Sequence, residues 1–155
     1  MEPASANQVF RALAQFNAGQ KGSTMKIKLT SVFVDDQDKA LKFYTEVLGF
    51  VKKMEFPAGK FKWLTVVSPE EPEGVQLVLE PNNAYNPAAK GYQQEIFRQG
   101  IPAANFFVAD VQKEYDRLTQ HGVTFTKEPT KTTGSTIAVL DDTCGNLIQI
   151  THLDW

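Results

Sequence analysis

The sequence has few of the residues on which thiol and metal chemistry depend. It holds one cysteine and two histidines among 155 residues. A single thiol excludes an internal disulfide and any CxxC motif. Cys144 follows Asp142 and Thr143 and has no basic neighbour, so nothing in the sequence lowers its thiol pKa. We therefore do not expect Cys144 to act as a nucleophile, and metal binding must rely on carboxylates or on His121 and His152.

The sequence also has a small net charge and no long apolar run. The formal net charge is -2, which gives no electrostatic basis for binding nucleic acid or an anionic membrane. No apolar run approaches the length of a transmembrane helix, and the N-terminus lacks the pattern of a secretory signal. We expect a cytoplasmic protein with neither a nucleic-acid nor a membrane partner.

One unit occurs twice along the chain. In the first copy, a strand that ends near Val34 is followed by a helix from Asp36 to Gly49. In the second, a strand over residues 101–108 is followed by a helix over 110–122. Each helix begins at an aspartate that can cap its free N–H groups and ends at a glycine that suits a left-handed C-cap. The chain is therefore interpreted as two copies of one strand–helix–strands module.

Three strands are predicted after each helix. Alternating apolar and polar residues between turn signals give these strands the ranges 50–56, 61–67, 75–80, 123–126, 132–140 and 146–151. We expect one domain over residues 25–155, with modules at 25–80 and 101–155. The linker over 81–100 includes one or two helical turns at 91–98.

Residues 1–24 do not belong to the repeat. Apolar residues at helical spacing predict a short helix from Ser5 to Phe16. This leader either packs on a protein surface or is a non-native extension of the domain. If it mediates association, its deletion should change the oligomeric state and leave the rest of the fold intact.

Several short motifs together identify a family resemblance. A strand ending in Val-x-Asp, the pair Phe43-Tyr44, the triplet Leu48-Gly49-Phe50 and the pair Gly145-Asn146 resemble the vicinal oxygen chelate superfamily. That group includes glyoxalase I, bleomycin-resistance proteins and extradiol dioxygenases. The resemblance implies an α+β fold in which two β-α-β-β-β modules form a curved mixed sheet around a cup. It also implies a homodimer.

The two-residue period of a strand predicts which side chains face the cup. Val32 and Val34 should contact the helix, as should Leu77 and Leu79 on a later strand. The predicted ligand-binding residues are Ser31, Phe33, Trp63, Gln76, Glu80, Asn105, Phe107, Gln149 and Thr151. Apolar walls with a few polar groups are typical of a small-molecule pocket, and the aromatic residues suit a flat ligand.

The resemblance implies four positions that hold a divalent metal in the enzymes of this superfamily. These positions are occupied here by Leu29, Glu80, Ala103 and Gln149. Leucine and alanine cannot donate to a metal, and a neutral amide is a weak ligand. His121 falls in a turn after a helix, and His152 should point away from the cup. We therefore predict no metal and no other cofactor.

The leading hypothesis is a glyoxalase/bleomycin-resistance-like protein that binds a small, partly apolar molecule in the cup without a catalytic metal. The alternative is a divergent enzyme of the same superfamily. Such an enzyme would be a metal-dependent lyase or dioxygenase, or a metal-free isomerase with Glu80 as a tentative catalytic base. The sequence leaves open whether any reaction is catalysed.

Overall fold

The computed structural model describes residue 14 and residues 24–83 and 87–155. The predicted helix from Ser5 to Phe16 lies outside these residues except for Ala14, which is helical and exposed. None of the described helices is long and apolar enough to cross a membrane.

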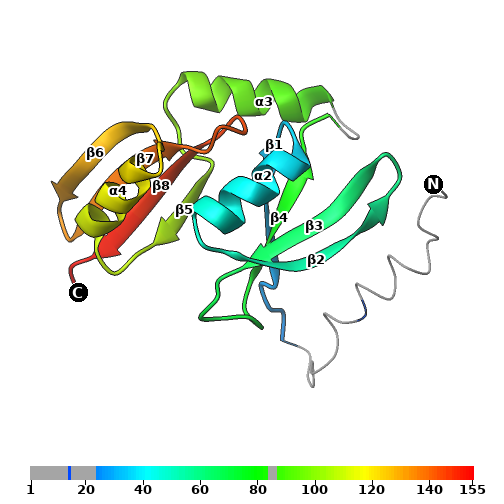
Figure 1. Cartoon of the computed structure of the whole chain (residues 1–155), viewed down its shortest axis with the longest axis horizontal. Helices are drawn as coiled ribbons and strands as arrows, with labels where there is room; N and C mark the ends of the chain where they lie inside the picture. The colour runs from blue at the N-terminus through cyan, green and yellow to red at the C-terminus, as the bar shows by residue number, and fades with distance from the viewer. Residues whose placement is uncertain (1–13, 15–23, 84–86) are drawn as a thin grey trace.

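The first module forms a four-stranded mixed sheet with a helix on one face (Figure 1). Its elements are β1 (Leu29–Val34), α2 (Gln37–Lys42), the π-helix η1 (Phe43–Val47), β2 (Val51–Ala58), β3 (Phe61–Val67) and β4 (Gln76–Pro81). The strand order is β1-β4-β3-β2, with β1 parallel to β4 and the other neighbours antiparallel. β1 is therefore an edge strand of this sheet.

The second module repeats this arrangement after a linking helix. The elements are α3 (Pro87–Arg98), β5 (Ala104–Phe107), α4 (Val111–Gln120), β6 (Phe125–Thr132), β7 (Ser135–Asp141) and β8 (Leu147–Leu153). The strand order β5-β8-β7-β6 matches the order in the first sheet, and β5 is an edge strand. The predicted α+β fold of two β-α-β-β-β modules is confirmed.

Both predicted helix caps are present. The side chain of Asp36 accepts from the Lys39 amide at 2.9 Å, and Asp110 accepts from the Lys113 amide at 3.0 Å. Gly49 and Gly122 follow the helices with φ of 89° and 81°, a conformation that costs glycine little. These short-range signals were sufficient to predict where both helices begin and end.

Three elements differ from their predicted form. The first helix changes to π-helical geometry at Phe43, and the Thr45 hydroxyl donates to the Leu41 carbonyl at 2.6 Å within this segment. The linker helix α3 has 12 residues and begins at Pro87. Proline suits the first position of a helix, because the N–H at that position has no partner within the helix. β6 extends to Thr132 and is bulged, so its irregular pairing concealed the two-residue period.

A single core joins the two modules. Val32, Val34, Leu77 and Leu79 are buried against the helices as predicted, and in the second sheet Ile148 and Ile150 occupy the same core. Because the helix-covered faces of both sheets contribute to this core, the opposite faces point away from it. The predicted cup-facing residues therefore lie on two separate four-stranded sheets rather than on one continuous sheet.

A buried glutamine of α3 ties the linker to both modules. The Gln93 amide nitrogen donates to the Phe33 carbonyl at 2.8 Å and to the Cys144 carbonyl at 3.2 Å. It also lies 3.1 Å from Oδ1 of Asn146, and the Gln93 oxygen accepts from Asn82 at 2.8 Å. One side chain thus connects β1, the end of β4 and the turn before β8.

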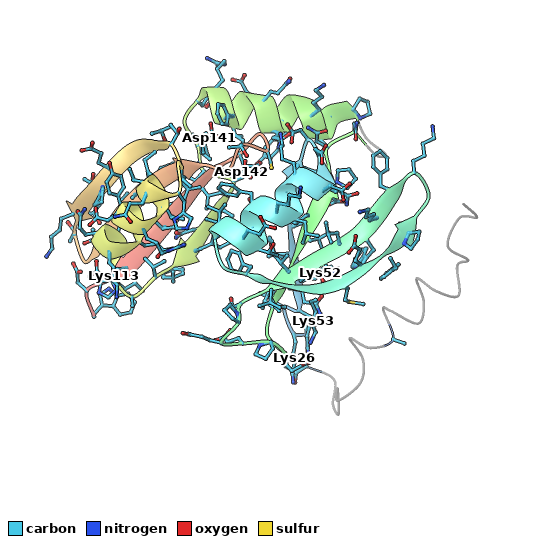
Figure 2. All side chains as sticks on the ribbon, viewed as in Figure 1. Lys26, Lys52, Lys53, Lys113, Asp141 and Asp142 are labelled. Atoms are coloured by element: carbon cyan, nitrogen blue, oxygen red, sulfur yellow. The ribbon has the colours of Figure 1, made fainter. Side chains whose placement is uncertain are left out.

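A second part of the same network surrounds Asp142, which lies at the junction of the modules (Figure 2). The hydroxyl of Tyr44 and the side-chain amide of Asn146 each donate to Oδ2 of Asp142 at 2.7 Å. The backbone amides of Cys144 and Asn146 donate to Oδ1 at 2.7 and 2.9 Å. Burial raises the pKa of Asp142 despite these donors, and burial followed by the Asp142 charge raises the pKa of Tyr44 well above its ordinary value.

We call the side chains of Tyr44, Asn82, Gln93, Asp142 and Asn146 the junction network. Its polar groups are buried and paired with one another or with backbone carbonyls. Paired groups of this kind stabilise one arrangement of the two modules, because any other arrangement leaves buried donors and acceptors unsatisfied.

Replacing Tyr44 with phenylalanine tests the junction network. The substitution Tyr44→Phe removes one of the donors to the buried Asp142 carboxylate and should lower the free energy of unfolding by about 1–3 kcal/mol. Urea denaturation followed by circular dichroism measures the change. Tyr92→Phe is the control, since the Tyr92 side chain is mostly exposed and should tolerate the loss of its hydroxyl. Equal stability of the two variants would contradict the assigned role.

Candidate functional site

Five of the predicted ligand-binding residues share one face of the first sheet. They are Ser31, Phe33, Trp63, Gln76 and Glu80. Leu77 and Leu79 lie in the core, so their neighbours Gln76 and Glu80 point to the opposite face. Phe33 is the Cα partner of Glu80 across β1 and β4, and Leu64 lies in the core beside Trp63. The strand period therefore placed these five residues together.

Four side chains form a row across this face. Phe33 pairs with Glu80, and Phe56 pairs with Trp63 at a ring-centroid distance of 6.2 Å and an interplanar angle of 20°. The strands β3 and β4 pair at Thr65–Val78 and Val66–Leu77, and beyond these pairs Trp63 and Glu80 lie on the same face of the two neighbouring strands. We call Phe33, Glu80, Trp63 and Phe56 the aromatic row.

Sequence reasoning missed Phe56. A signal was present, because the hairpin turn at Gly59 fixes the register of β2 and β3. With φ of 64° at Gly59, Ala58 pairs with Phe61, and two residues further along Phe56 faces Trp63. The register set by this turn therefore predicts that Phe56 lies opposite Trp63.

The helix α2 contributes a side chain at the point where β3 and β4 separate. Nε2 of Gln37 donates to the carbonyls of Lys62 and Leu79 at 2.8 and 2.9 Å, and its Oε1 accepts from the Lys62 amide at 3.0 Å. This buried amide replaces the hydrogen bonds that the two strands do not make there. Gln37 therefore fixes the spacing of the strands that carry Trp63 and Glu80.

Trp63 has an unusual polar atom. Among the described residues, its Nε1 is the single buried side-chain nitrogen or oxygen without a hydrogen-bond partner. A buried donor without an acceptor costs about 1–3 kcal/mol. The nearby Gln76 differs in this respect, because its oxygen accepts from the buried Thr65 hydroxyl at 2.7 Å. Gln76 is thus satisfied within the protein, whereas Trp63 retains a donor without a partner.

The other four predicted residues share one face of the second sheet. Asn105 pairs with Gln149, and Phe107 pairs with Thr151. The Thr151 hydroxyl donates to Oδ1 of Asn105 at 2.7 Å and lies 3.1 Å from Nε2 of Gln149. Phe107 is 64% exposed, which is unusual for a large apolar side chain. This face therefore offers a polar cluster beside an exposed ring.

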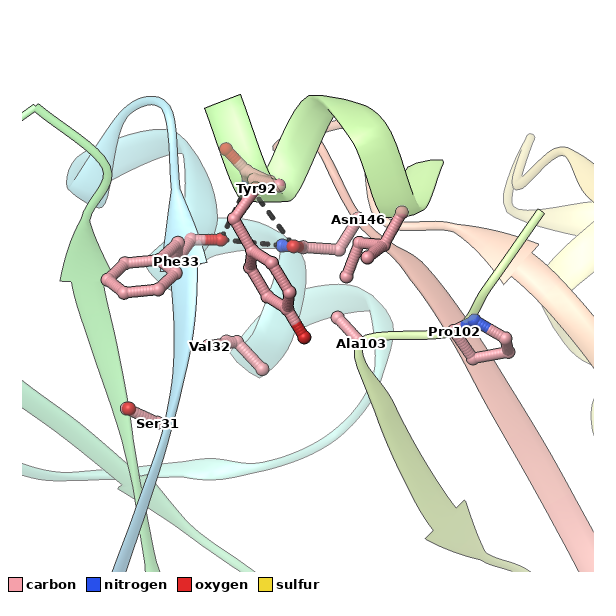
Figure 3. Close-up of a pocket in the computed structure, with 9 residues that line it drawn as sticks. Ser31, Val32, Phe33, Tyr92, Pro102, Ala103 and Asn146 are labelled. Carbon is pink, nitrogen blue, oxygen red and sulfur yellow. Dashed lines mark hydrogen bonds between the residues drawn. The ribbon is translucent and has the colours of Figure 1, made fainter. Parts of the chain in front are cut away.

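A cavity of about 180 Å³ lies beside β1 and the segment before β5. Its lining includes Ser31 and Phe33 from β1 and Ala103 from the segment before β5. Figure 3 shows the Tyr92 side chain extending from α3 into this space, between β1 and Ala103. The cavity thus includes two predicted ligand-binding residues and one of the positions at which related enzymes would carry a metal ligand.

The residues present do not fit a catalytic metal. Glu80 lies on the first sheet and Gln149 on the second, while Leu29 and Ala103 have no donor atoms. Among the described residues, no group of three or more His, Cys, Asp and Glu side chains could hold a metal ion. The amide nitrogen of Gln149 is engaged with Thr151.

Neither histidine changes this conclusion. His121 caps the end of α4, with Nδ1 2.8 Å from the Arg117 carbonyl. His152 lies in β8 with Nδ1 3.3 Å from the Val108 carbonyl, beside the core-facing Ile150 rather than on the face of Thr151. Both placements agree with the sequence-based interpretation.

Cys144 is buried in the turn between β7 and β8. Burial is the largest cause that raises the pKa of its thiol, to about 12, and the Asp142 charge adds to the effect. A thiol with so high a pKa supplies almost no thiolate at neutral pH. Cys144 is therefore a core residue, and its raised thiol pKa agrees with the expectation that it is not a nucleophile.

Comparison with known proteins agrees with this geometry. A family model described as "Glyoxalase/Bleomycin resistance protein/Dioxygenase superfamily" matches residues 26–150. The uncharacterized protein YurT of Bacillus subtilis (strain 168) is 64% identical over 126 residues, which are 81% of this chain and 98% of YurT. The crystal structure of UcmS2 has a TM-score of 0.73 and 32% identity, covering 86% of this chain and 100% of UcmS2.

A second structural neighbour is TnmS3, an antibiotic binding protein from Streptomyces sp. CB03234. Its TM-score is 0.67 and its identity 26%, with coverage of 86% of this chain and 99% of TnmS3. The family model covers most of the residues, and the resemblance to the vicinal oxygen chelate superfamily is confirmed. The chain belongs to the glyoxalase/bleomycin resistance protein/dioxygenase superfamily.

Proposed function

We propose that this protein binds a small, partly apolar molecule at the predicted cup, without a catalytic metal. The aromatic row carries the proposal, because it places three rings, one carboxylate and one unpartnered indole N–H on a single sheet face. Apolar walls with few polar groups suit ligand binding. Similarity to TnmS3, an antibiotic binding protein, supports sequestration over catalysis.

We further propose that the functional unit is a homodimer. The predicted ligand-binding residues lie on two sheets in which β1 and β5 are edge strands. Large apolar residues are exposed at and before β1, with Met25 98% and Ile27 82% exposed, and Phe107 is exposed on β5. A second copy that covers these residues would bring the second-sheet face of one protomer toward the first-sheet face of the other.

An enzymatic role for Glu80 is the second candidate. Among the described residues, no salt bridge includes its carboxylate, so it is not committed to a structural ion pair. A carboxylate beside aromatic rings can act as a general base. Turnover of a bound compound that is lost in Glu80→Gln while binding persists would establish an isomerase-type enzyme instead of a binding protein.

The metal content of the purified protein tests the metal-free proposal. Because the four family positions provide only one strong donor, we expect much less than one equivalent of Zn, Ni, Mn or Fe by inductively coupled plasma mass spectrometry. The measurement should be repeated after incubation with each ion and gel filtration. One tightly held equivalent would contradict the proposal.

Binding of planar aromatic fragments tests the location of the site. In saturation-transfer NMR, we expect several fragments to bind the wild-type protein and Trp63→Ala to weaken them by about tenfold, the effect of losing a stacking contact of 1–1.5 kcal/mol. Trp155→Ala is the matched control, because Trp155 is 90% exposed near the C-terminus. If both variants lose the same affinity for the fragments, the binding site does not include Trp63.

The proposed dimer can be tested at the exposed residue before β1. Sedimentation should give about twice the 17.3 kDa chain mass for the wild type. Burying Ile27 is worth about 1.5–3 kcal/mol, so Ile27→Arg should weaken association at least tenfold. Val51→Arg is the control, since Val51 is also exposed but lies on β2, the opposite edge of the same sheet. A monomeric wild type would contradict the proposal.

A further inference from the structure

We infer that the ligand of the aromatic row is a planar organic cation, with its positive charge at Glu80 and its ring against Trp63. This inference rests on the proposed function and adds the charge and shape of the ligand to it. It depends on three observations: the state of the Glu80 carboxylate, the rings beside it, and the unpartnered N–H of Trp63.

The carboxylate of Glu80 has no counter-charge among the described residues. It is half-buried and takes part in none of the salt bridges. Lys62 on the adjacent strand does not compensate for it, because its ammonium pairs with Asp38 and Glu55. A partly desolvated carboxylate beside apolar rings is stabilised when a cation binds to it.

The neighbours of Glu80 favour an organic cation over a metal ion. Phe33 is its partner on β1, and Trp63 lies on the neighbouring strand and stacks with Phe56. None of these three side chains offers a donor pair that a metal ion requires. The faces of aromatic rings attract ammonium, guanidinium and pyridinium-type cations, and Trp attracts them most strongly.

The ring arrangement also selects for shape. The rings of Phe56 and Trp63 stack with an interplanar angle of 20°, so each ring keeps one flat face that the other ring does not cover. A flat cation can place its ring on such a surface while its charge remains near Glu80. A compact, fully aliphatic ammonium would make the charge contact but would leave most of the ring surface uncovered.

The indole N–H of Trp63 adds a third requirement. Because Nε1 is buried without an acceptor, a ligand that carries an acceptor can gain a hydrogen bond that the protein alone does not make. Because Nε1 is buried, a ligand acceptor can reach it only when the side chains that cover it move. The indole N–H proton resonance should therefore report this contact directly.

Two planar probes of similar size differ in charge and in the ring-nitrogen acceptor, which only the neutral probe carries. N-methylquinolinium is a permanent cation, whereas quinoline is neutral at pH 7 and carries a ring-nitrogen acceptor. In calorimetric titrations of the full chain, we expect the cation to bind about tenfold more tightly than quinoline, the effect of one desolvated cation–π and carboxylate contact. Quinoline should shift the Trp63 Nε1–H resonance, observed in a Trp155→Phe background.

Glu80→Gln should abolish the preference for the cation and leave the affinity for quinoline within about twofold. Glu46→Gln removes the same charge from the exposed surface of η1 and should retain the preference. Thermal unfolding of each variant verifies that it is folded. If Glu80→Gln does not fold, the wild type still provides a test, because the preference must decrease as salt screens the charge.

Equal affinities for the two probes would overturn the inference, as would a preference that survives Glu80→Gln or that is insensitive to salt. Those outcomes would leave the proposed function in place, because both probes would still bind. Failure of both probes, together with failure of the planar fragments to bind, would instead contradict the proposed function itself.

Discussion

The buried amide of Gln93 is the interaction on which the arrangement of the two modules depends. It holds the carbonyls of Phe33 and Cys144 on one side and receives the Asn82 amide on the other. Each of these partners belongs to a different segment, so a hydrophobic residue at Gln93 would leave several buried groups without partners. Space at this point is also limited, because a Cβ added at Gly145 would lie 2.6 Å from the Gln93 amide nitrogen.

The junction network links the scaffold to the candidate site. The Phe33 carbonyl accepts from both Gln93 and Asn146, while the Phe33 ring belongs to the aromatic row. The second module therefore fixes the backbone of a residue whose side chain lies on the proposed ligand-binding face of the first. On the other side of the sheet, Gln37 fixes β3 against β4 in the same manner. Buried amides thus determine the geometry of the row from two directions.

Local signals predicted most of the fold, and long-range contacts explain what they missed. Aspartate caps, glycine stops and the two-residue strand period located both helices and the buried faces, because each depends on residues near one another in sequence. The arrangement of the two modules depends on long-range contacts such as those of Gln93, which no local pattern encodes. For the site, strand alternation grouped the residues of each sheet correctly. It could not show that Phe56 faces Trp63 or that the indole N–H lacks an acceptor.

The loss of metal ligands and the character of the aromatic row have a common physical consequence. Where the superfamily resemblance implies several metal donors, this chain has a single carboxylate, Glu80, with Phe33 and Trp63 on the neighbouring strands. A single carboxylate provides too few donor atoms to bind a divalent ion tightly. A carboxylate charge in a partly apolar environment is nevertheless costly when no counter-charge lies beside it. An organic cation resolves this conflict, because it neutralises Glu80 through one contact and offers apolar surface to Phe33 and Trp63. A single carboxylate beside aromatic rings is thus the donor set that suits the proposed organic cation better than a divalent metal ion.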